Sequence, residues 1–278
     1  MDDGTVDRLD GETFYVTTTS TGADGVYQWF TWWNAVWHMD VELANLTGAL
    51  AAVNVAGPNA RTVMERVSQD DFSNEGLGYL DARHVRVAGV PTLALRIGFV
   101  GELGYELHFP SPHAEHVWDT LLERGADLGA RPFGLEPQRI LRLEKGHVIV
   151  SQDTDSESNL LEAAMPWIFK ADKDDFVGKW ATEQVAERGL KWMLAGFESP
   201  TGKVPLEGGQ ILVGGKSSGR VTSARRSAEL GKVIGLAIMP VGLAVEGGQF
   251  DVVIDGKPVE MRVHLGPFFD PDGKRLRG

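Results

Sequence analysis

Acidic residues in glycine-rich surroundings are the side chains of this sequence best suited to chemistry. Asp3 precedes Gly4, and Glu102 and Glu106 lie in the run G-F-V-G-E-L-G-Y-E at 98–106. Glycine lets the backbone approach a ligand closely. A carboxylate accepts paired hydrogen bonds from an amidine-like edge, or stabilises a developing cation. Both roles suit nitrogen heterocycles and iminium chemistry, although turn glycines beside solvated acids would leave the same pattern.

Other chemical classes find little support in the sequence. The chain has no cysteine, which excludes disulfides, thiolate nucleophiles and cysteine-ligated metals. The run 209–217 resembles a phosphate loop, but an extra glycine breaks the spacing and a hairpin turn is expected instead. The run 153–157 resembles the start of a calcium loop, yet Ser158 and Ala164 stand where its glycine and closing glutamate belong. No metal site is therefore predicted.

Charge and hydropathy narrow the possible partners and the location. With 27 Lys+Arg against 39 Asp+Glu, the formal net charge of the 278 residues is −12, which disfavours nucleic acid and anionic lipid. The apolar runs are far shorter than the roughly 20 residues that span a bilayer. The first residues lack the basic and apolar blocks of a signal peptide. A cytoplasmic protein without membrane or nucleic-acid partners is expected.

The elements that must position the acidic residues alternate between strands and helices. Runs 5–9 and 13–18 flank Asp10-Gly11, a pair typical of hairpin turns. The helical run 24–37 is aromatic around most of its circumference, which predicts a core helix or, alternatively, a helix that docks onto another domain or subunit. Further strands are predicted at 41–46, 49–56, 82–87, 92–97 and 104–109, and helices at 58–67, 112–126, 134–145 and 176–188. This mixture is typical of the α+β class.

The character of the chain changes after Gly189. Short glycine-punctuated strands are predicted at 192–198, 210–213, 219–223, 233–239, 250–254 and 259–265. Their spacing is that of a small all-β barrel or sandwich. We therefore expect two domains, 1–188 and 189–278.

Several separate motifs resemble one known family. The segment 98–110 resembles the G-Y-T-G-E-x-G-x-E motif of the folate-dependent aminomethyltransferases, the T-protein of the glycine cleavage system. The helix at 134–146 and the following H-V-I-V-S-Q-D-T-D look still more like the carboxy-terminal, folate-binding half of the sarcosine oxidase α subunit. V-T-S at 221–223 and P-F-F-D-P at 267–271 resemble the family's barrel domain. The resemblance implies a T-protein-like folate-binding domain followed by a β-barrel.

The resemblance also implies roles for two acidic residues. Asp3 falls on the acidic residue of the family's D-D motif, which implies a catalytic carboxylate that stabilises a cationic iminium and exchanges a proton with a folate amine. Glu106 falls on the glutamate that holds the amino-pyrimidine edge of the pterin, through two parallel N–H to carboxylate bonds. Both residues are predicted to lie at one tetrahydrofolate site.

Four further residues are candidates for folate contact. Phe99 stands where the family commonly has tyrosine, so a hydroxyl contact there is lost. Gln138 aligns with an arginine of T-proteins, and Arg139 is adjacent, a pattern nearer to the oxidase type. Arg226, next to Arg225, is a candidate for the negatively charged glutamyl tail of folate, or is plain surface.

The resemblance implies a tetrahydrofolate-dependent one-carbon transfer domain of a sarcosine oxidase-type enzyme. The carbon of an oxidised N-methyl amine, as iminium or formaldehyde, would be captured as methylene-tetrahydrofolate. The alternatives are a glycine cleavage T-protein and a non-catalytic folate-binding or scaffold module. Because the family has a segment before its D-D motif, we expect Met1 to be an internal methionine, with flavin and NAD sites in missing or partner regions and with oxidase subunits as partners.

Overall fold

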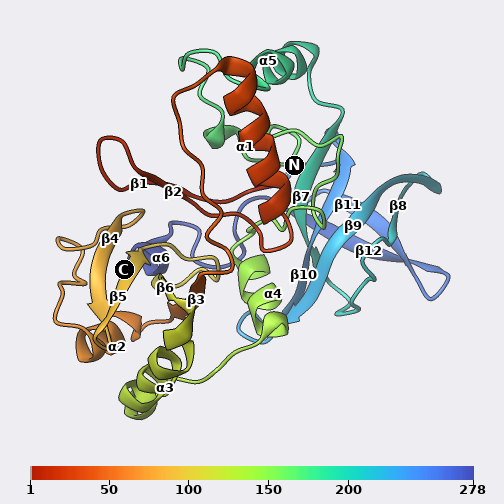
Figure 1. The fold of residues 1–278 in the computed structure, drawn as a ribbon. Helices are drawn as coiled ribbons and strands as arrows, with labels where there is room; N and C mark the ends of the chain where they lie inside the picture. The colour runs from red at the N-terminus through yellow and green to blue at the C-terminus, as the bar shows by residue number, and fades with distance from the viewer. Residues whose placement is uncertain (1) are drawn as a thin grey trace. The chain divides into compact units, whose positions relative to one another are not determined.

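The computed structural model describes residues 2–278, so the expectation about Met1 lies outside the described residues. The chain forms two compact units: one ends at Gly134 and includes Gly273–Gly278, and the other is Leu135–Asp272 (Figure 1). The first combines antiparallel strands with helices and the second contains a closed barrel, which confirms the predicted α+β class with a β-barrel. The domain boundary near Arg188 stays a prediction.

The first unit is built on a four-stranded antiparallel sheet in the order β3-β6-β5-β4. Its strands are β1 (Val6–Arg8), β2 (Phe14–Val16), β3 (Leu50–Ala56), β4 (Ala82–Val87), β5 (Val90–Leu95) and β6 (Gly104–Pro110). Its helices are α1 (Ala23–Trp37), α2 (Ala60–Val67), α3 (Ala114–Gly125) and α6 (Lys274–Arg277), with short 3-10 turns at Ser111–His113 and Ala126–Leu128.

One face of this sheet carries the hydrophobic core. Helices α2 and α3 cover it with Val63, Met64, Val117 and Leu121, which pack with Leu107 of β6 in a single buried cluster. The spacing of these helix residues places them on one side of each helix. Each fully buried side chain of this kind contributes about 1.5–3 kcal/mol. The opposite face carries the polar side chains of Glu106 and His108, with the buried Leu95 and Leu93 as their cross-strand neighbours on β5.

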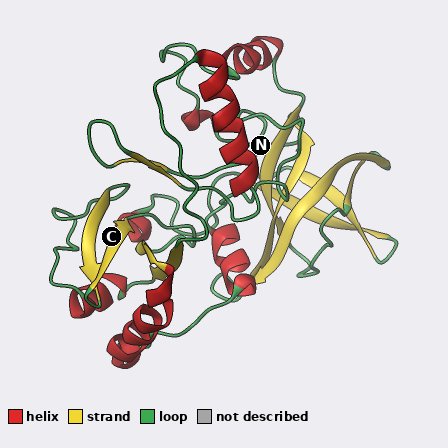
Figure 2. Cartoon of the chain, in the orientation of Figure 1, coloured by secondary structure: helices red, strands yellow, loops and turns green. Residues whose placement is uncertain are grey.

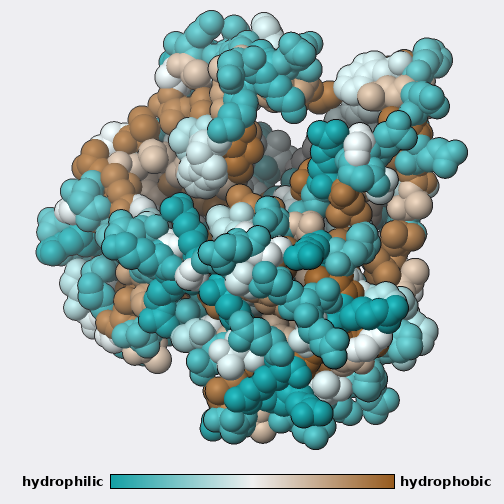
Figure 3. Space-filling view, turned by 90° about the vertical axis from the view of Figure 1, so that its left-hand side faces the viewer, coloured by the Kyte–Doolittle hydropathy of each residue, from teal (hydrophilic) through white to brown (hydrophobic). Residues whose placement is uncertain are grey.

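Two expectations for the amino-terminal part are wrong. Residues 41–46 form no strand: Val41 is 48% and Leu46 46% exposed, and Val41 is the only β-branched residue of the run V-E-L-A-N-L. Helix α1 buries none of its residues, so it is no core helix. Trp32, for example, is 64% exposed. Figure 3 shows hydrophobic residues, in brown, at the surface of the molecule.

A buried arginine holds the carboxy-terminal segment in the first unit. Arg96 is fully buried and donates to the backbone carbonyls of Leu276 and Arg277, at 3.2 and 3.0 Å. Leu276 is also buried, and its Cδ1 would lie 2.6 Å from any Cβ placed at Gly98. Glycine at 98 is thus required by close packing of this segment.

The second unit is a closed barrel with strand order β10-β7-β12-β11-β8-β9 (Figure 2). Its strands are β7 (Trp192–Ser199), β8 (Gln210–Val213), β9 (Lys216–Ser227), β10 (Lys232–Pro240), β11 (Gln249–Ile254) and β12 (Lys257–His264). Its helices are α4 (Leu135–Glu144) and α5 (Lys179–Arg188), with a 3-10 turn at Pro166–Ile168. The supposed phosphate loop is the β8–β9 turn, as predicted. No helix of residues 2–278 is long and apolar enough to cross a membrane.

Candidate functional site

Strand β6 sorts its side chains between the two faces of the sheet. Tyr105, Leu107 and Phe109 are buried in the core, while Glu106 and His108 are only partly buried. This follows from the two-residue period of a strand, in which successive side chains point to opposite faces. Glu106 and His108 therefore lie together on the face that helices α2 and α3 do not cover.

An unpartnered hydrogen-bond acceptor stands directly across from Glu106. Asn54 of β3 is its direct cross-strand partner, and Leu95 of β5 flanks it on the other side. The side-chain carbonyl oxygen of Asn54 is buried and has no hydrogen-bond partner. Directly opposed residues of an antiparallel pair have Cβ atoms about 4.5–5.5 Å apart. A carboxylate beside an unpartnered carbonyl favours a ligand that offers several N–H donors.

His108 connects Glu106 to the β1–β2 hairpin. Its Nδ1 lies 3.0 Å from the Tyr15 Oη, and its Nε2 lies 3.5 Å from the Glu106 Oε2. The two rings meet edge to face, with centroids 5.4 Å apart. Burial, with the negative charges of Asp7 and Glu106, raises the pKa of Tyr15 above its ordinary value, so the phenol stays protonated at neutral pH.

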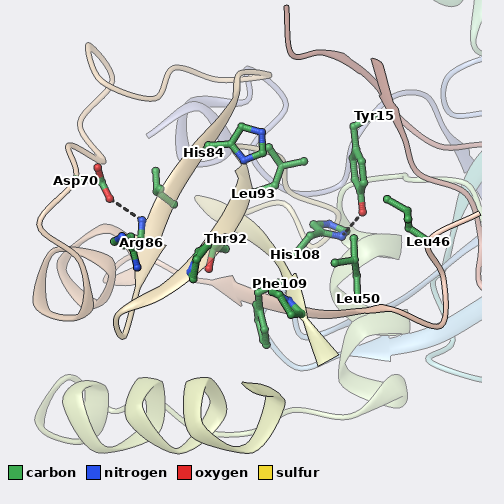
Figure 4. Close-up of a pocket in the computed structure, with 13 residues that line it drawn as sticks. Tyr15, Leu46, Leu50, Asp70, His84, Arg86, Thr92, Leu93, His108 and Phe109 are labelled. Carbon is green, nitrogen blue, oxygen red and sulfur yellow. Dashed lines mark hydrogen bonds between the residues drawn. The ribbon is translucent and has the colours of Figure 1, made fainter. Parts of the chain in front are cut away.

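An open groove of about 550 Å³ runs beside this contact. Figure 4 shows Tyr15 and His108 at one end, and Asp70, which accepts the backbone N–H of Arg86 at 2.7 Å, at the other. Between them the lining is largely apolar, with Leu93 among its members. The groove gives a small molecule room next to the polar face of the sheet.

Asp3 lies three residues before β1, the first strand of the hairpin that carries Tyr15. Asp2 is held by Thr19, whose backbone N–H and hydroxyl donate to its Oδ2 at 3.2 and 3.0 Å. A Cβ at Gly4 would lie 1.8 Å from the Thr17 carbonyl oxygen, so the two strands can approach here only with glycine. Partial desolvation raises the pKa of Asp3, and repulsion by Asp2 raises it further.

The two glutamates of the glycine-rich motif have different surroundings: Glu102 lies in the loop and Glu106 on strand β6. Glu102 is largely buried, and its Oε1 forms an ion pair with the Nε of Arg275 at 2.7 Å. This pair holds the carboxy-terminal segment in place. Glu106 instead stands on the polar face of the sheet. Phe99 is half-buried in the same loop between β5 and β6. The resemblance assigned folate contact to Glu106 and Phe99, and the structure places both near the β5–β6 connection of the first unit.

The three remaining candidates lie in the second unit. Gln138 and Arg139 are on helix α4, where Arg139 pairs with Glu136 at 3.1 Å. Arg226 on β9 is exposed and donates to the Gly202 carbonyl at 2.6 Å, whereas its neighbour Arg225 pairs with Glu136 at 3.1 Å. Their contact with folate stays a prediction.

Motifs of the second unit that the resemblance singled out form a buried polar network. Arg142 of α4 and Asp153 pair at 2.6 Å with almost no exposure of either side chain. Asp153 also accepts the hydroxyls of Thr222 and Ser223, both at 2.6 Å. A register shift at Leu236 breaks the strict alternation of β9, which lets these neighbouring hydroxyls reach the same carboxylate. Asp153, the first acid of the apparent calcium loop, is thus a structural counterion.

Glu144 gives a prediction about pH and stability. It is buried and accepts the Ser227 hydroxyl at 2.6 Å; burial raises the pKa of Glu144 against this bond, with repulsion by Glu229 adding to the rise. The folded state therefore binds this proton at higher pH than the unfolded chain, and the ionised carboxylate lowers stability at neutral pH. Glu144→Gln is expected to raise the free energy of unfolding at pH 7.

The stability advantage of Glu144→Gln over the wild type should shrink as the pH falls from the raised pKa of Glu144 toward the ordinary value for glutamate. The wild-type carboxyl then becomes neutral too. Urea denaturation between pH 7 and 4.5 measures the difference. Glu260→Gln, at an exposed position of β12, controls for the loss of one carboxylate. If the difference in free energy of unfolding between Glu144→Gln and the wild type grew as the pH fell, the pKa of Glu144 would be lowered rather than raised on folding.

Three residues of the polar face escaped the sequence analysis: Asn54, His108 and Tyr15. The two-residue period of β6 would have placed His108 on the face of Glu106. Nothing in the sequence indicates the contact between Tyr15 and His108, because it joins residues 93 positions apart.

Comparison with known proteins identifies the family. The GCVT N-terminal domain profile matches residues 1–173, and the glycine cleavage T-protein C-terminal barrel domain profile matches residues 193–270. An aminomethyltransferase of Caldanaerobacter subterraneus is 31% identical over 99% of this chain and 73% of its own length. A sarcosine oxidase subunit alpha of a Corynebacterium species is 33% identical over the whole chain but only 30% of its own length.

The fold agrees with a solved structure. The crystal structure of the glycine cleavage system aminomethyltransferase T from Bartonella henselae matches 98% of this chain and 73% of that chain, with a TM-score of 0.86 and 21% identity. This match confirms the predicted T-protein-like fold. The two domain profiles and the 31% identical aminomethyltransferase show that the chain belongs to the glycine cleavage T-protein family.

Proposed function

We propose that this chain is a tetrahydrofolate-dependent one-carbon transfer domain. It would capture the carbon released by oxidation of an N-methyl amine, such as sarcosine, as methylene-tetrahydrofolate. Family membership and the similarity to both aminomethyltransferases and a sarcosine oxidase α subunit support this proposal. The observation that carries it is the acceptor pair formed by Glu106 and the unpartnered Asn54 carbonyl on one sheet face.

The residues of this face suit a reduced pterin. Its amino-pyrimidine edge offers adjacent N–H donors, which match a carboxylate in two parallel hydrogen bonds. Glu106 would make this pair, and Asn54 would accept a further N–H that otherwise leaves its buried oxygen unsatisfied. Glu106 and Asn54 do not line the groove, but His108, which faces Glu106, does, and the groove would take the rest of the molecule.

Asp3 is the proposed catalytic residue. When bound, the reduced folate supplies nitrogens that accept a carbon at the formaldehyde level of oxidation. Asp3 would stabilise the positive charge of the incoming iminium through its carboxylate and would hold the proton released at the accepting nitrogen. That proton would pass to the demethylated amine, which leaves as its bond to the transferred carbon breaks; with formaldehyde as donor, the oxygen would leave as water. Proximity supplies the remaining advantage, because a reactive carbon unit reaches a bound acceptor without escaping to water.

The amine and its oxidation would lie elsewhere. We propose that flavin and NAD, if used, bind to oxidase subunits or to other regions of the enzyme, as the match to 30% of a sarcosine oxidase α subunit suggests. The N-methyl amine would then reach this chain already as an iminium or as formaldehyde. Phe99, Gln138, Arg139 and Arg226 remain proposed folate contacts.

A second candidate is a T-protein that takes an aminomethyl group from a lipoyl carrier and releases ammonia. Its support is the aminomethyltransferase relative, of which the chain covers 73%. The two candidates share the folate face and differ in the carbon donor. Ammonia release from an aminomethyl-lipoyl carrier, with no response to an N-methyl amine oxidase, would favour the T-protein.

Removal of the Glu106 carboxylate tests the folate site itself. Glu106→Ala is expected to weaken reduced-folate binding by about 10–100-fold, because a charged acceptor of two hydrogen bonds is lost. Titration of the full chain with tetrahydrofolate, followed by tryptophan fluorescence, measures the affinity, and circular dichroism checks the fold.

Glu102→Gln is the matched control, because Glu102 belongs to the same motif but pairs with Arg275. It should leave the affinity near that of the wild type. Unchanged affinity in Glu106→Ala would refute the folate face. Binding without one-carbon turnover in any reconstituted system would instead support the non-catalytic module.

A further inference from the structure

We propose that His108 is a positioning residue that fixes the Glu106 carboxylate for the folate and, through Tyr15, ties the Asp3 hairpin to the same face. This inference rests on the proposed function and adds to it the residue that holds its two acidic groups in place. The contacts of His108 carry it: Tyr15 Oη lies 3.0 Å from Nδ1, and Glu106 Oε2 lies 3.5 Å from Nε2.

The chemistry of the contact assigns the ring proton. A bare Nε2 lone pair facing an anionic carboxylate would be repelled, so Nε2 carries the proton and points it toward Glu106. In a neutral imidazole Nδ1 is then an acceptor. The Tyr15 O–H donates to it, which agrees with the protonated phenol. Tyr15 thus donates to His108, and the Nε2–H of His108 faces Glu106.

The His108 ring is largely shielded from water, so few groups other than Tyr15 and Glu106 are available to its nitrogens. The His108 side chain is only 10% exposed, and its Nε2 is buried without a hydrogen bond that meets ordinary criteria. The 3.5 Å approach to Glu106 is longer than a normal N–H to oxygen bond, so the pair has room to tighten. A ligand that draws both carboxylate oxygens into place would complete the bond, as catalytic and binding contacts often do.

The same ring links two separate elements of the first unit. Tyr15 belongs to β2, which pairs with β1 in the register Asp7 to Tyr15, and Asp3 lies just before β1. Glu106 and His108 belong to β6. A side chain that accepts from Tyr15 and faces Glu106 with its N–H therefore couples the position of the hairpin, which Asp3 precedes, to that of the Glu106 carboxylate.

The experiment compares three variants of the full chain by tetrahydrofolate titration. His108→Leu removes both contacts and should weaken binding by about tenfold. His108→Gln places an amide N–H where Nε2 stood and should recover most of the affinity. Tyr15→Phe should give an intermediate affinity. It removes the hydroxyl that holds Nδ1 of His108 but leaves the Nε2–H that faces Glu106.

Two controls separate positioning from a general loss of structure. His116→Leu alters an exposed histidine of α3, on the core side of the sheet, and should bind like the wild type. In a Glu106→Gln background, His108→Leu should cause little further loss, because His108 acts through the Glu106 carboxylate. Equal, additive losses in both backgrounds would show that His108 does not position Glu106.

Ring nitrogen NMR of the wild-type chain gives an answer even if His108→Leu fails to fold. The His108 resonances, assigned by their loss in His108→Gln, should show the Nε2–H tautomer; an Nδ1–H tautomer would overturn the proposal. If His108→Leu folds and binds normally while Glu106→Ala does not, the positioning role fails and the folate site stands. If Glu106→Ala binds normally, the proposed function itself fails.

Discussion

Asp3→Asn is expected to lower folate-dependent turnover by about 10²–10⁴-fold, the usual effect of losing a positioned acid or base. Asparagine keeps the size and the hydrogen-bonding oxygen of the side chain but cannot hold the negative charge or the transferred proton. Reduced-folate affinity should stay within about threefold, because the lost interaction belongs to the transition state rather than to binding. Turnover in a reconstituted oxidase complex, with tetrahydrofolate titration alongside, measures both.

The fall of turnover at low pH, the acid limb of the pH–rate profile, provides a second measurement for Asp3. Its pKa is raised by partial desolvation and by the charge of Asp2, so the required carboxylate is lost at a higher pH than for an ordinary aspartate. Asp2→Asn removes the repulsion and should move the acid limb to lower pH, with the plateau rate little changed. Equal turnover in Asp3→Asn and wild type would refute the catalytic assignment.

Asp153→Asn is expected to destabilise the second unit by about 3–5 kcal/mol, the cost of leaving a buried charge without its counterion. Arg142 donates to Asp153 at 2.6 Å, and the backbone N–H of Ile149 donates to the same oxygen at 2.8 Å. An amide in place of the carboxylate would leave the guanidinium uncompensated. Urea denaturation followed by circular dichroism measures the loss.

Asp155→Asn, two residues further on, is the matched control. Asp155 pairs with Arg220 at the same 2.6 Å, but both side chains are more than 40% exposed. Exposed pairs contribute at most about 1 kcal/mol, because water screens the charges. A loss below about 1 kcal/mol in both variants would show that Arg142 does not depend on Asp153.

Much of the fold was accessible from local sequence pattern. Alternating runs such as 82–87 and 210–213 are strands with those bounds, and the Asp10-Gly11 pair joins β1 to β2. These elements follow from side-chain periodicity and turn chemistry, which act over a few residues. The segment 41–46 failed for the complementary reason, since its apolar residues find no neighbouring strand.

The motifs that resemble the family indicate its chemistry and its architecture. They do not show which of their residues face a ligand and which hold the fold together. Glu102 and Glu106 share one motif, yet one fastens the carboxy-terminal segment and the other stands on the polar face. Likewise Asp153 and the V-T-S run belong to motifs that resemble the family, and the structure shows that Asp153 neutralises Arg142 inside the second unit while Thr222 and Ser223 donate to it. Residue type and spacing do not tell which partner a carboxylate meets.

Composition, periodicity and local motifs are enough to predict the class of the two units, the family resemblance and the acidic candidates Asp3 and Glu106, and the two-residue period of β6 also puts His108 on the face of Glu106. The folded chain was needed to show that Asn54 stands opposite Glu106 and that Tyr15 reaches His108. Those contacts join residues from separate strands through sheet register and packing, and such pairings depend on the whole fold rather than on any single segment.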